Sequence, residues 1–384
     1  GTVILYAVIY LGEAIPISLP ASMLGLAPGA QWILILFLYA GIASLLPVWL
    51  LLQPRDYING IQLLVGLGLL YGAVLIANPA IVAPAINADL PASAPPMLPL
   101  LFVTIACGAI SGFHGLVGSG TTSKQLNKET DARFVGYLGS SGEGALALVA
   151  IIAATAGFAS QAEWRLMYSE FGNGGLTAFV QGGAVIVSNG VGISREFAAT
   201  LLTVMAVLFA GTTMDAGVRL QRYIIQEWGA IYKIPVLQNG YVATGVAVAT
   251  CLLLAFGASA ARGLPAGEGG MVIWPLFGTT NQLLAGLTLS IIAVILLRKG
   301  RPVLPVLGPL VFLLVMSVYA LIVQMGEFWA TENWLLLVLD VIILIAAVWV
   351  IFESAIVMSR AKKSPPELDE DAMEGTAAGK RSSR

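Results

Sequence analysis

The chain has 384 residues, of which 58% are hydrophobic and only 10% are charged, and its formal net charge is −2. A soluble domain carries roughly 25% charged and about 45–50% apolar residues, so this composition excludes a water-soluble protein and indicates one embedded in a membrane. With 19 basic and 21 acidic residues there is no basic surplus for binding nucleic acid. One histidine and two cysteines make a His/Cys metal centre unfavourable, and we expect no metal and no cofactor.

Ten apolar runs are long enough to cross a bilayer, since a crossing helix needs about 20 residues. They cover approximately residues 2–24, 31–52, 58–81, 97–120, 136–159, 196–216, 238–257, 272–297, 303–325 and 333–358. The sequence therefore predicts an all-α polytopic membrane protein with a single transmembrane domain over 1–360. The polar run over 361–384 is typical of a disordered tail.

The basic residues divide unequally between the two sides of this bundle. When alternate loops are compared, sixteen of the nineteen fall on one side, and only Arg165, Arg195 and Arg262 fall on the other. Because Lys and Arg accumulate on the cytoplasmic side, this division predicts a cytoplasmic C-terminal tail. It holds only if the shorter, glycine-rich stretch over 176–192 does not cross, so we expect that stretch to be re-entrant or interfacial.

The run that begins at residue 97 becomes rich in glycine and in hydroxyl-bearing residues over 106–124, ACGAISGFHGLVGSGTTSK. Free backbone groups in hydrocarbon cost several kcal/mol each, so we expect a broken helix beside a cavity, where backbone and hydroxyl groups can bind a solute. The candidate solute-binding residues are Ser111, His114, Gly118, Ser119, Gly120, Thr121 and Thr122. The alternative is that the small residues only allow two helices to pack closely.

Isolated charges lie in or near three other spans. Glu143 is flanked by glycines, and because a carboxylate is costly to charge in a membrane, Glu143 and His114 are candidate proton carriers; the alternative is that Glu143 is hydrated at the interface. Asp215 precedes Arg219 by four residues, which allows an ion pair on one helix face. That pair is either an inner gate or a salt bridge that fixes the helix end. Asp340 lies deep in the last span, where we expect a helix–helix hydrogen bond.

Four consecutive polar residues, 279–282, follow Pro275 and Gly278 in a further span. The proline and the glycine predict an interrupted helix. Because consecutive residues cannot share one helix face, at least one of the four should face the bundle interior or a cavity. Asn281 and Gln282 are candidates for a wall of the solute site, and the alternative is that they form hydrogen bonds between helices.

Two broken, polar-lined segments and isolated carboxylates favour a secondary transporter. The sequence contains no G-x-x-x-x-G-K-[ST] loop for an ATP-driven pump and no H-E-x-x-H motif for a zinc protease. We therefore expect no enzymatic activity.

Four long stretches resemble the successive signatures of the carbon-starvation protein A family. They are GIASLLPVWLLLQPRDYING (41–60), ACGAISGFHGLVGSGTTSKQL (106–126), TTMDAGVRLQRYIIQE (212–227) and IWPLFGTTNQLLAG (273–286). The resemblance implies an inner-membrane importer of peptides or, in some members, a proton-coupled importer of pyruvate, active in carbon starvation. It also implies a core distantly similar to that of the amino acid–polyamine–organocation transporters.

The chain departs from the family pattern in three respects, one of which is GYLG at 136–139 in place of the family's usual Gly-Tyr-Gly stretch. The TTPK pattern of the family reads TTSK at 121–124, and the membrane segments that precede the first motif in the family are absent, so the resemblance is to an N-terminally truncated member. The expected partners are a small solute, protons, the lipid bilayer, and an N-terminal half or a second copy of the chain. The alternative functions are a non-transporting sensor or partner subunit, an inactive fragment, and a passive channel.

Overall fold

The computed structural model describes residues 1–15, 19–20, 25–91, 94–170 and 174–363, and the regular elements in these residues are all helices. The chain forms two compact units. Unit 1 contains residues 1–94 and 121–253, and unit 2 contains residues 95–120 and 254–384. The expectation of one transmembrane domain over 1–360 stays a prediction.

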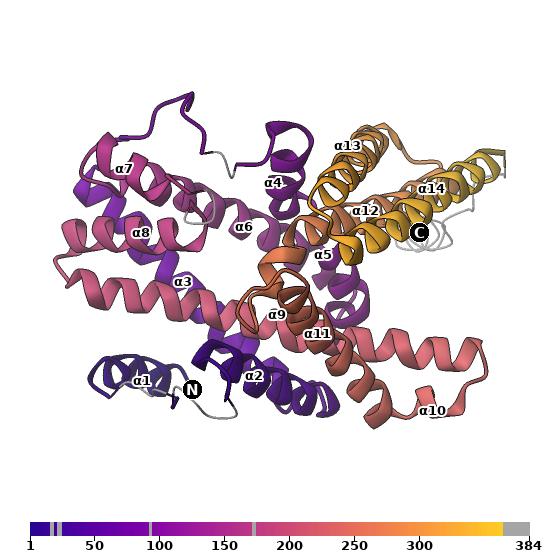
Figure 1. The fold of residues 1–384 in the computed structure, drawn as a ribbon, viewed down its shortest axis with the longest axis horizontal. Coiled ribbons are helices and arrows are strands. Elements are labelled where there is room, and N and C mark those ends of the chain that lie inside the picture. Colours follow the sequence, from indigo (N-terminus) through magenta and orange to yellow (C-terminus); the bar gives the residue numbers. More distant parts are fainter. Residues whose placement is uncertain (16–18, 21–24, 92–93, 171–173, 364–384) are drawn as a thin grey trace, which may run out of the picture. The chain divides into compact units, whose positions relative to one another are not determined.

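Eight helices in the described part of the chain are long and apolar enough to cross a membrane (Figure 1). They are α2 (Pro28–Leu45), α3 (Leu52–Ala77), α6 (Asp131–Ala156), α9 (Arg195–Ile231), α11 (Gly240–Ala261), α12 (Gly269–Arg298), α13 (Leu304–Ala330) and α14 (Trp334–Lys363). They coincide with eight of the ten predicted runs, which confirms an all-α polytopic membrane protein. Of the other two runs, the first yields α1 (Thr2–Ala14), which has only 13 residues, and the run over 97–120 is broken into short helices.

Two predictions about the helices are wrong: the end of the span over 196–216 and the interruption at Pro275. Helix α9 has 37 residues and continues to Ile231, so Arg219 and Arg222, which were counted as loop charges, lie within a helix. The apolar pattern ends near residue 216, but polar residues with good helix propensity continue the helix beyond it. Helix α12 runs unbroken through Pro275, because a proline removes one backbone hydrogen bond while the remainder of the helix continues.

Unit 1 is built around α8 (Leu176–Val191), which contacts α3, α6 and α9 (Figure 1). Glycines allow this close packing: a Cβ atom on Gly182 would overlap the carbonyl oxygen of Ala153 in α6. Leu70, Ile186 and Leu202 from three of these helices belong to one buried cluster. With 16 residues α8 is about 24 Å long, shorter than the roughly 30 Å hydrocarbon core, and its re-entrant or interfacial position stays a prediction.

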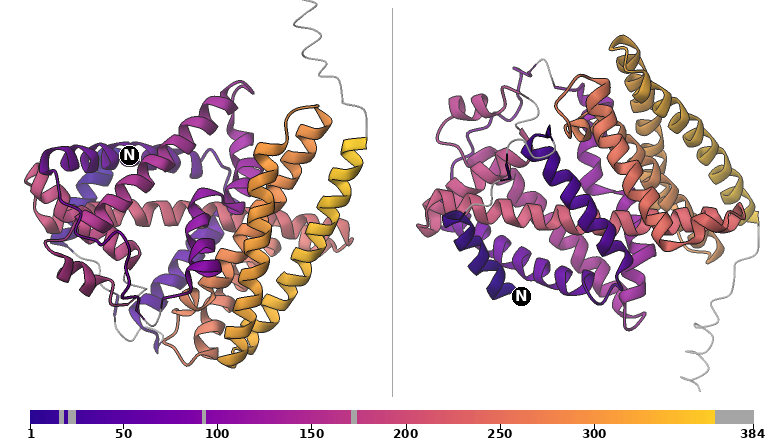
Figure 2. Two further views of the ribbon diagram at one scale, coloured as in Figure 1. Left: turned by 90° about the horizontal axis from the view of Figure 1, so that it is seen from above. Right: turned by 60° about the horizontal axis from the view of Figure 1, so that its bottom comes forward.

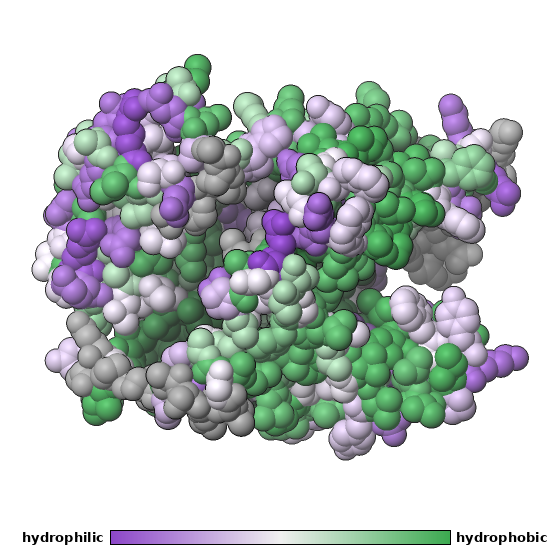
Figure 3. Space-filling view, viewed as in Figure 1, coloured by the Kyte–Doolittle hydropathy of each residue, from purple (hydrophilic) through white to green (hydrophobic). Residues whose placement is uncertain are grey.

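Two short helices complete unit 1. Helix α10 (Pro235–Gln238) packs against α9, and α7 (Gln161–Met167) is capped by the Ser160 hydroxyl. Near α7 the Trp164 and Tyr168 rings stack with centroids 4.7 Å apart, and burial raises the pKa of the Tyr168 hydroxyl. In Figure 3 the surface over α7 is largely hydrophilic, whereas the surfaces over α2 and α13 are largely hydrophobic, as expected of lipid-facing helices.

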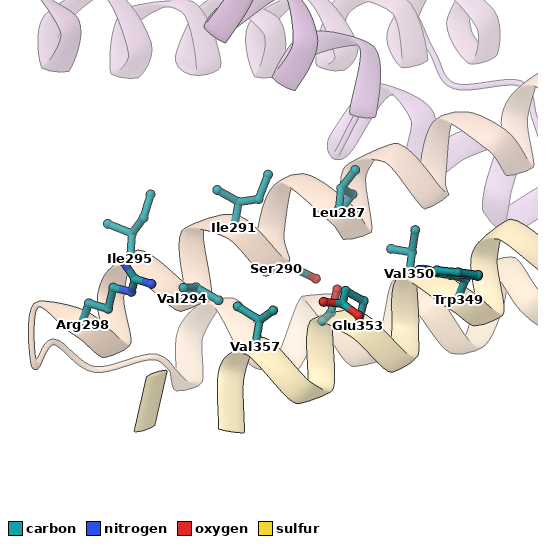
Figure 4. Close-up of a pocket in the computed structure, with 11 residues that line it drawn as sticks. Leu287, Ser290, Ile291, Val294, Ile295, Arg298, Trp349, Val350, Glu353 and Val357 are labelled. Carbon is teal, nitrogen blue, oxygen red and sulfur yellow. The ribbon is translucent and has the colours of Figure 1, made fainter. Parts of the chain in front are cut away.

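Unit 2 is a bundle of α12, α13 and α14, which lie side by side in Figure 2 and contact one another in all three pairs. Helix α4 (Phe102–Ala109) and helix α5 (Gly112–Val117) pack against α12. Farther along α12 and α14, a groove of about 470 Å³ opens between the two helices, with Ser290, Arg298, Trp349 and Glu353 among its lining residues (Figure 4). The predicted tail begins at residue 361, but α14 continues to Lys363, and residues 364–384 lie outside the described residues.

Candidate functional site

The predicted break in the glycine-rich segment is confirmed. The chain forms a π-helical turn (Met97–Leu101) and α4, leaves helical geometry at residues 110–111, and resumes as α5. Ser111 has extended backbone angles, and its hydroxyl accepts a hydrogen bond of 3.5 Å from the backbone N–H of His114. Ser111 is therefore the N-cap of α5, a position that serine favours because its oxygen can satisfy an otherwise unpaired helix N–H.

Asn281 of α12 supports the break from the neighbouring helix. Its side-chain oxygen accepts hydrogen bonds from the Ser111 hydroxyl at 3.1 Å and from the Phe113 backbone N–H at 2.8 Å. Asn281 is 2% exposed, so these contacts are made inside unit 2. Of the two roles considered for this residue, the structure therefore contains the hydrogen bond between helices.

Glycines in α5 bring it against the backbone of α12. A Cβ atom on Gly112 would lie 2.5 Å from the backbone nitrogen of Ala285, and one on Gly115 would lie 2.5 Å from the Thr288 hydroxyl. Gly118 has no such neighbour within 4 Å. Close helix packing thus accounts for Gly112 and Gly115 but not for Gly118.

The remaining candidates around α5 lie in more open positions. His114, Gly118 and Ser119 are exposed, and the Ser119 hydroxyl donates to the carbonyl of Gly115 at 2.9 Å. Gly118 opens a π-helical turn (Gly118–Thr122), which is followed by a 3₁₀ turn (Ser123–Gln125). Helical geometry of this kind is frequent at functional sites.

The end of the π-helical turn is less exposed than its start. Gly120, the last residue of the segment in unit 2, is half-buried, and Thr122 in unit 1 is half-buried as well. Thr121 is 5% exposed, and its hydroxyl makes no hydrogen bond within the described residues. Thr121 is thus a buried hydroxyl with unused hydrogen-bonding capacity.

The polar run in α12 faces inward, as predicted. The Thr279 hydroxyl donates to the Gln324 side-chain oxygen in α13 at 3.1 Å. Gln282 is 1% exposed, and neither its nitrogen nor its oxygen has a hydrogen-bond partner in the described part of the chain. Buried amides are rarely left in this state, so Gln282 is a candidate for contact with a bound solute or water.

A second polar centre lies in unit 1, where Arg55 of α3 forms an ion pair with Asp215 of α9 at 2.6 Å. The Tyr39 hydroxyl of α2 accepts a hydrogen bond from Arg55 at 2.7 Å and donates to Asp215 at 3.2 Å. The Asp215 side chain is 3% exposed and that of Arg55 is 18% exposed. Three helices thus meet at one buried charge pair.

The expected Asp215–Arg219 pair is wrong. The Arg219 guanidinium instead donates to the carbonyls of Ala43 at 2.6 Å and Leu46 at 2.9 Å, at the end of α2. The last carbonyls of a helix are unpaired and carry the negative end of its dipole, so they attract Arg219 and leave Asp215 to Arg55.

Sequence reasoning missed Arg55 because it was counted as a loop charge. The available signal was its place within PRDYING, at the very start of an apolar run. Asn59, one turn later, donates to the Thr212 hydroxyl at 2.5 Å, and a Cβ atom on Gly211 would overlap Arg55. These contacts join two segments that are distant in the sequence, which no local pattern displays.

Glu143 lies on α6 twelve residues after Asp131 and is exposed. It belongs to unit 1, whereas His114, the other candidate proton carrier, belongs to unit 2. In the described part of the chain, no group of three or more His, Cys, Asp or Glu side chains could hold a metal ion.

The described residues define a polytopic α-helical membrane protein with a discontinuous helix and buried polar contacts between its helices. A family model described as carbon starvation protein CstA matches residues 1–170 and 165–320. The chain belongs to this family.

Several curated relatives are similar to the chain. The "Peptide transporter CstA" of Helicobacter pylori strain J99 is 31% identical over 347 residues, which cover 78% of this chain and 50% of the relative. The "Peptide transporter CstA" of Mycobacterium tuberculosis strain H37Rv is 34% identical, with 70% of this chain and 42% of the relative covered. The "Pyruvate/proton symporter BtsT" of Escherichia coli K12 is 30% identical, with 74% and 49% covered. The chain spans about half the length of the curated relatives it matches, and no solved structure matches it.

Proposed function

We propose that the chain acts in a secondary transporter that imports small organic acids of the pyruvate type, or short peptides, together with protons during carbon starvation, and that it is not an enzyme. The observation that carries this proposal is the discontinuous helix at Ser111, supported by Asn281. In transporters, broken helices at membrane depth expose backbone groups to a bound solute. The names of the relatives support the same class of activity.

We assign direct solute contact to the open part of the segment and to Gln282. The backbone of Gly118 and Gly120, the hydroxyls of Ser119, Thr121 and Thr122, the imidazole of His114 and the Gln282 amide provide donors and acceptors for a carboxylate or a peptide group. Ser111 and Asn281 are already hydrogen-bonded to each other, so they form the supporting wall of this site.

His114 and Glu143 are the proposed proton carriers. Each is an exposed titratable side chain on a short or glycine-rich stretch of helix. The proposed inner gate contains Asp215, which is paired with Arg55, and Arg219, which is bonded to the end of α2. Opening such a gate requires hydration of the separated charges, since an unpaired buried charge is costly.

The proposed location is the inner membrane with a cytoplasmic C-terminus, which follows from the division of basic residues. The proposed partners are the bilayer, the solute, protons, and an N-terminal half or a second copy of the chain.

Uptake of radiolabelled pyruvate and of a radiolabelled dipeptide into proteoliposomes tests this proposal. An inward proton gradient should drive accumulation of one of them, and Glu143→Gln should abolish the effect of the gradient. Glu129→Gln is the matched control, because Glu129 is exposed and lies before α6. Saturable binding without uptake, even when an N-terminal half is co-reconstituted, would instead favour a sensor.

A further inference from the structure

Asp340 is the most completely buried carboxylate that the described helices contain. It is 0% exposed, and neither of its carboxylate oxygens has a hydrogen-bond partner within the described residues. The helix–helix hydrogen bond expected for it is therefore not formed. Its neighbours along α14, Leu336 and Ala347, belong to a buried cluster with Leu276 of α12 and Leu321 of α13. The carboxylate thus lies among apolar side chains of three helices.

Helix geometry places Asp340 at the level of two other polar residues. Gln324 lies six residues before the end of α13 and Asp340 lies six residues after the start of α14, so both are about 9 Å from the connecting turn. Thr279 is at the same level, as its hydrogen bond to Gln324 requires. Thr279, Gln324 and Asp340 therefore form one polar layer inside unit 2.

In this layer, the Gln324 side chain uses only one of its two polar atoms in hydrogen bonds within the described residues. The Gln324 oxygen accepts from Thr279, but the Gln324 nitrogen makes no hydrogen bond in the described part of the chain. Because the Asp340 oxygens are also without a partner among the described residues, Gln324 and Asp340 are not hydrogen-bonded to each other, and no donor compensates a charge on Asp340.

Among the residues that the structure describes, no charged group faces Asp340 from the helices that pack against α14. On α13, Glu327 and Tyr319 are exposed. On α12 the only charged residue is Arg298, which lies 19 residues, or about 28 Å, beyond Thr279. On α14 itself, Glu353 is 13 residues away from Asp340 and lines the open groove (Figure 4). An ionised Asp340 would therefore be an uncompensated buried charge, which proteins avoid.

We propose that Asp340 is a proton-binding site inside unit 2, separate from His114 and Glu143. A proton adds to one carboxylate oxygen, the charge is removed, and no other bond changes. This inference concerns the bundle alone and can be tested without any transport measurement.

Reaction with dicyclohexylcarbodiimide, an apolar reagent that modifies protonated carboxyl groups, tests the proposal. The purified chain in lipid nanodiscs is labelled at about pH 7, and the peptides are analysed by mass spectrometry. We expect labelling of Asp340 at least about tenfold above that of Glu353, the open carboxylate on the same helix, and labelling that declines as the pH is raised. Equal labelling of the two residues, or none at Asp340 at any pH, would overturn the proposal.

A second readout uses Asp340→Asn, which keeps the shape of the side chain without a proton to lose. The thermal unfolding temperature of the wild-type chain is compared at about pH 5 and about pH 8. If the folded state binds this proton and the unfolded state does not, stability falls as the pH rises, and Asp340→Asn removes that fall. Glu353→Gln should leave it unchanged. An identical fall in Asp340→Asn and the wild type would contradict a proton on Asp340.

Discussion

Arg55 and Asp215 form an ion pair with a separation of 2.6 Å that joins α3 to α9, two helices separated by more than a hundred residues of sequence. The hydroxyl of Tyr39 in α2 accepts a hydrogen bond from Arg55 and donates one to Asp215. The pair is buried in unit 1, in contrast to the ion pair between Arg165 and Asp89, whose side chains are 50% and 69% exposed. The two pairs provide a matched comparison.

Removing one partner of the buried pair should destabilise unit 1 strongly. Asp215→Asn leaves Arg55 without its counter-charge, which costs about 3–5 kcal/mol in a buried site. Asp89→Asn, at the exposed pair, should cost no more than about 1 kcal/mol. Equilibrium unfolding in mixed micelles measures both. Equal effects of the two variants would contradict a structural role for the buried pair.

Asn281→Ala should loosen the break before α5. The change removes two acceptor contacts and leaves the Phe113 N–H unpaired, at a cost of about 1–3 kcal/mol. Hydrogen exchange of the peptide over 108–116 should become faster. Thr280→Ala is the control, because within the described residues that hydroxyl bonds only to the carbonyl of Leu276 in its own helix. Unchanged exchange in Asn281→Ala would show that the break is stable without this support.

Gly112→Ala should separate α5 from α12. The added methyl group would contact the backbone of Ala285 at 2.5 Å, and overpacking of this kind costs about 1–3 kcal/mol. Gly108→Ala, on α4, meets no atom within 4 Å and should stabilise its helix by up to about 1 kcal/mol. The two variants therefore differ in sign, and unfolding temperatures that shift in the same direction would contradict the packing of α5 on α12.

Sequence patterns predicted those features that depend on composition and on local breaks. The eight long helices follow from apolar length, and the break near Ser111 follows from the density of glycines. The patterns failed where a contact depends on a residue that is distant in the sequence. Asp215 pairs with Arg55 rather than Arg219 because α3 and α2 supply better partners, and α12 stays continuous through Pro275 because a single lost hydrogen bond does not end a helix.

The topology prediction for α8 can be tested with Ser188→Cys. If α8 does not cross the bilayer, an impermeant maleimide should label this position from the side opposite the C-terminal tail. Ala88→Cys reports the same side and Tyr232→Cys reports the cytoplasmic side, and both positions are exposed. Labelling of Ser188→Cys only from the cytoplasmic side would overturn the predicted topology.

We propose that protons drive solute movement through the protein. The most direct measurement is the initial rate of solute uptake into proteoliposomes with an inward proton gradient, compared with the rate after a protonophore has collapsed that gradient. We expect accumulation above the external concentration, and we expect the protonophore to abolish it. Uptake that only equilibrates the solute, at a rate that does not depend on the gradient, would contradict it and would indicate a passive channel.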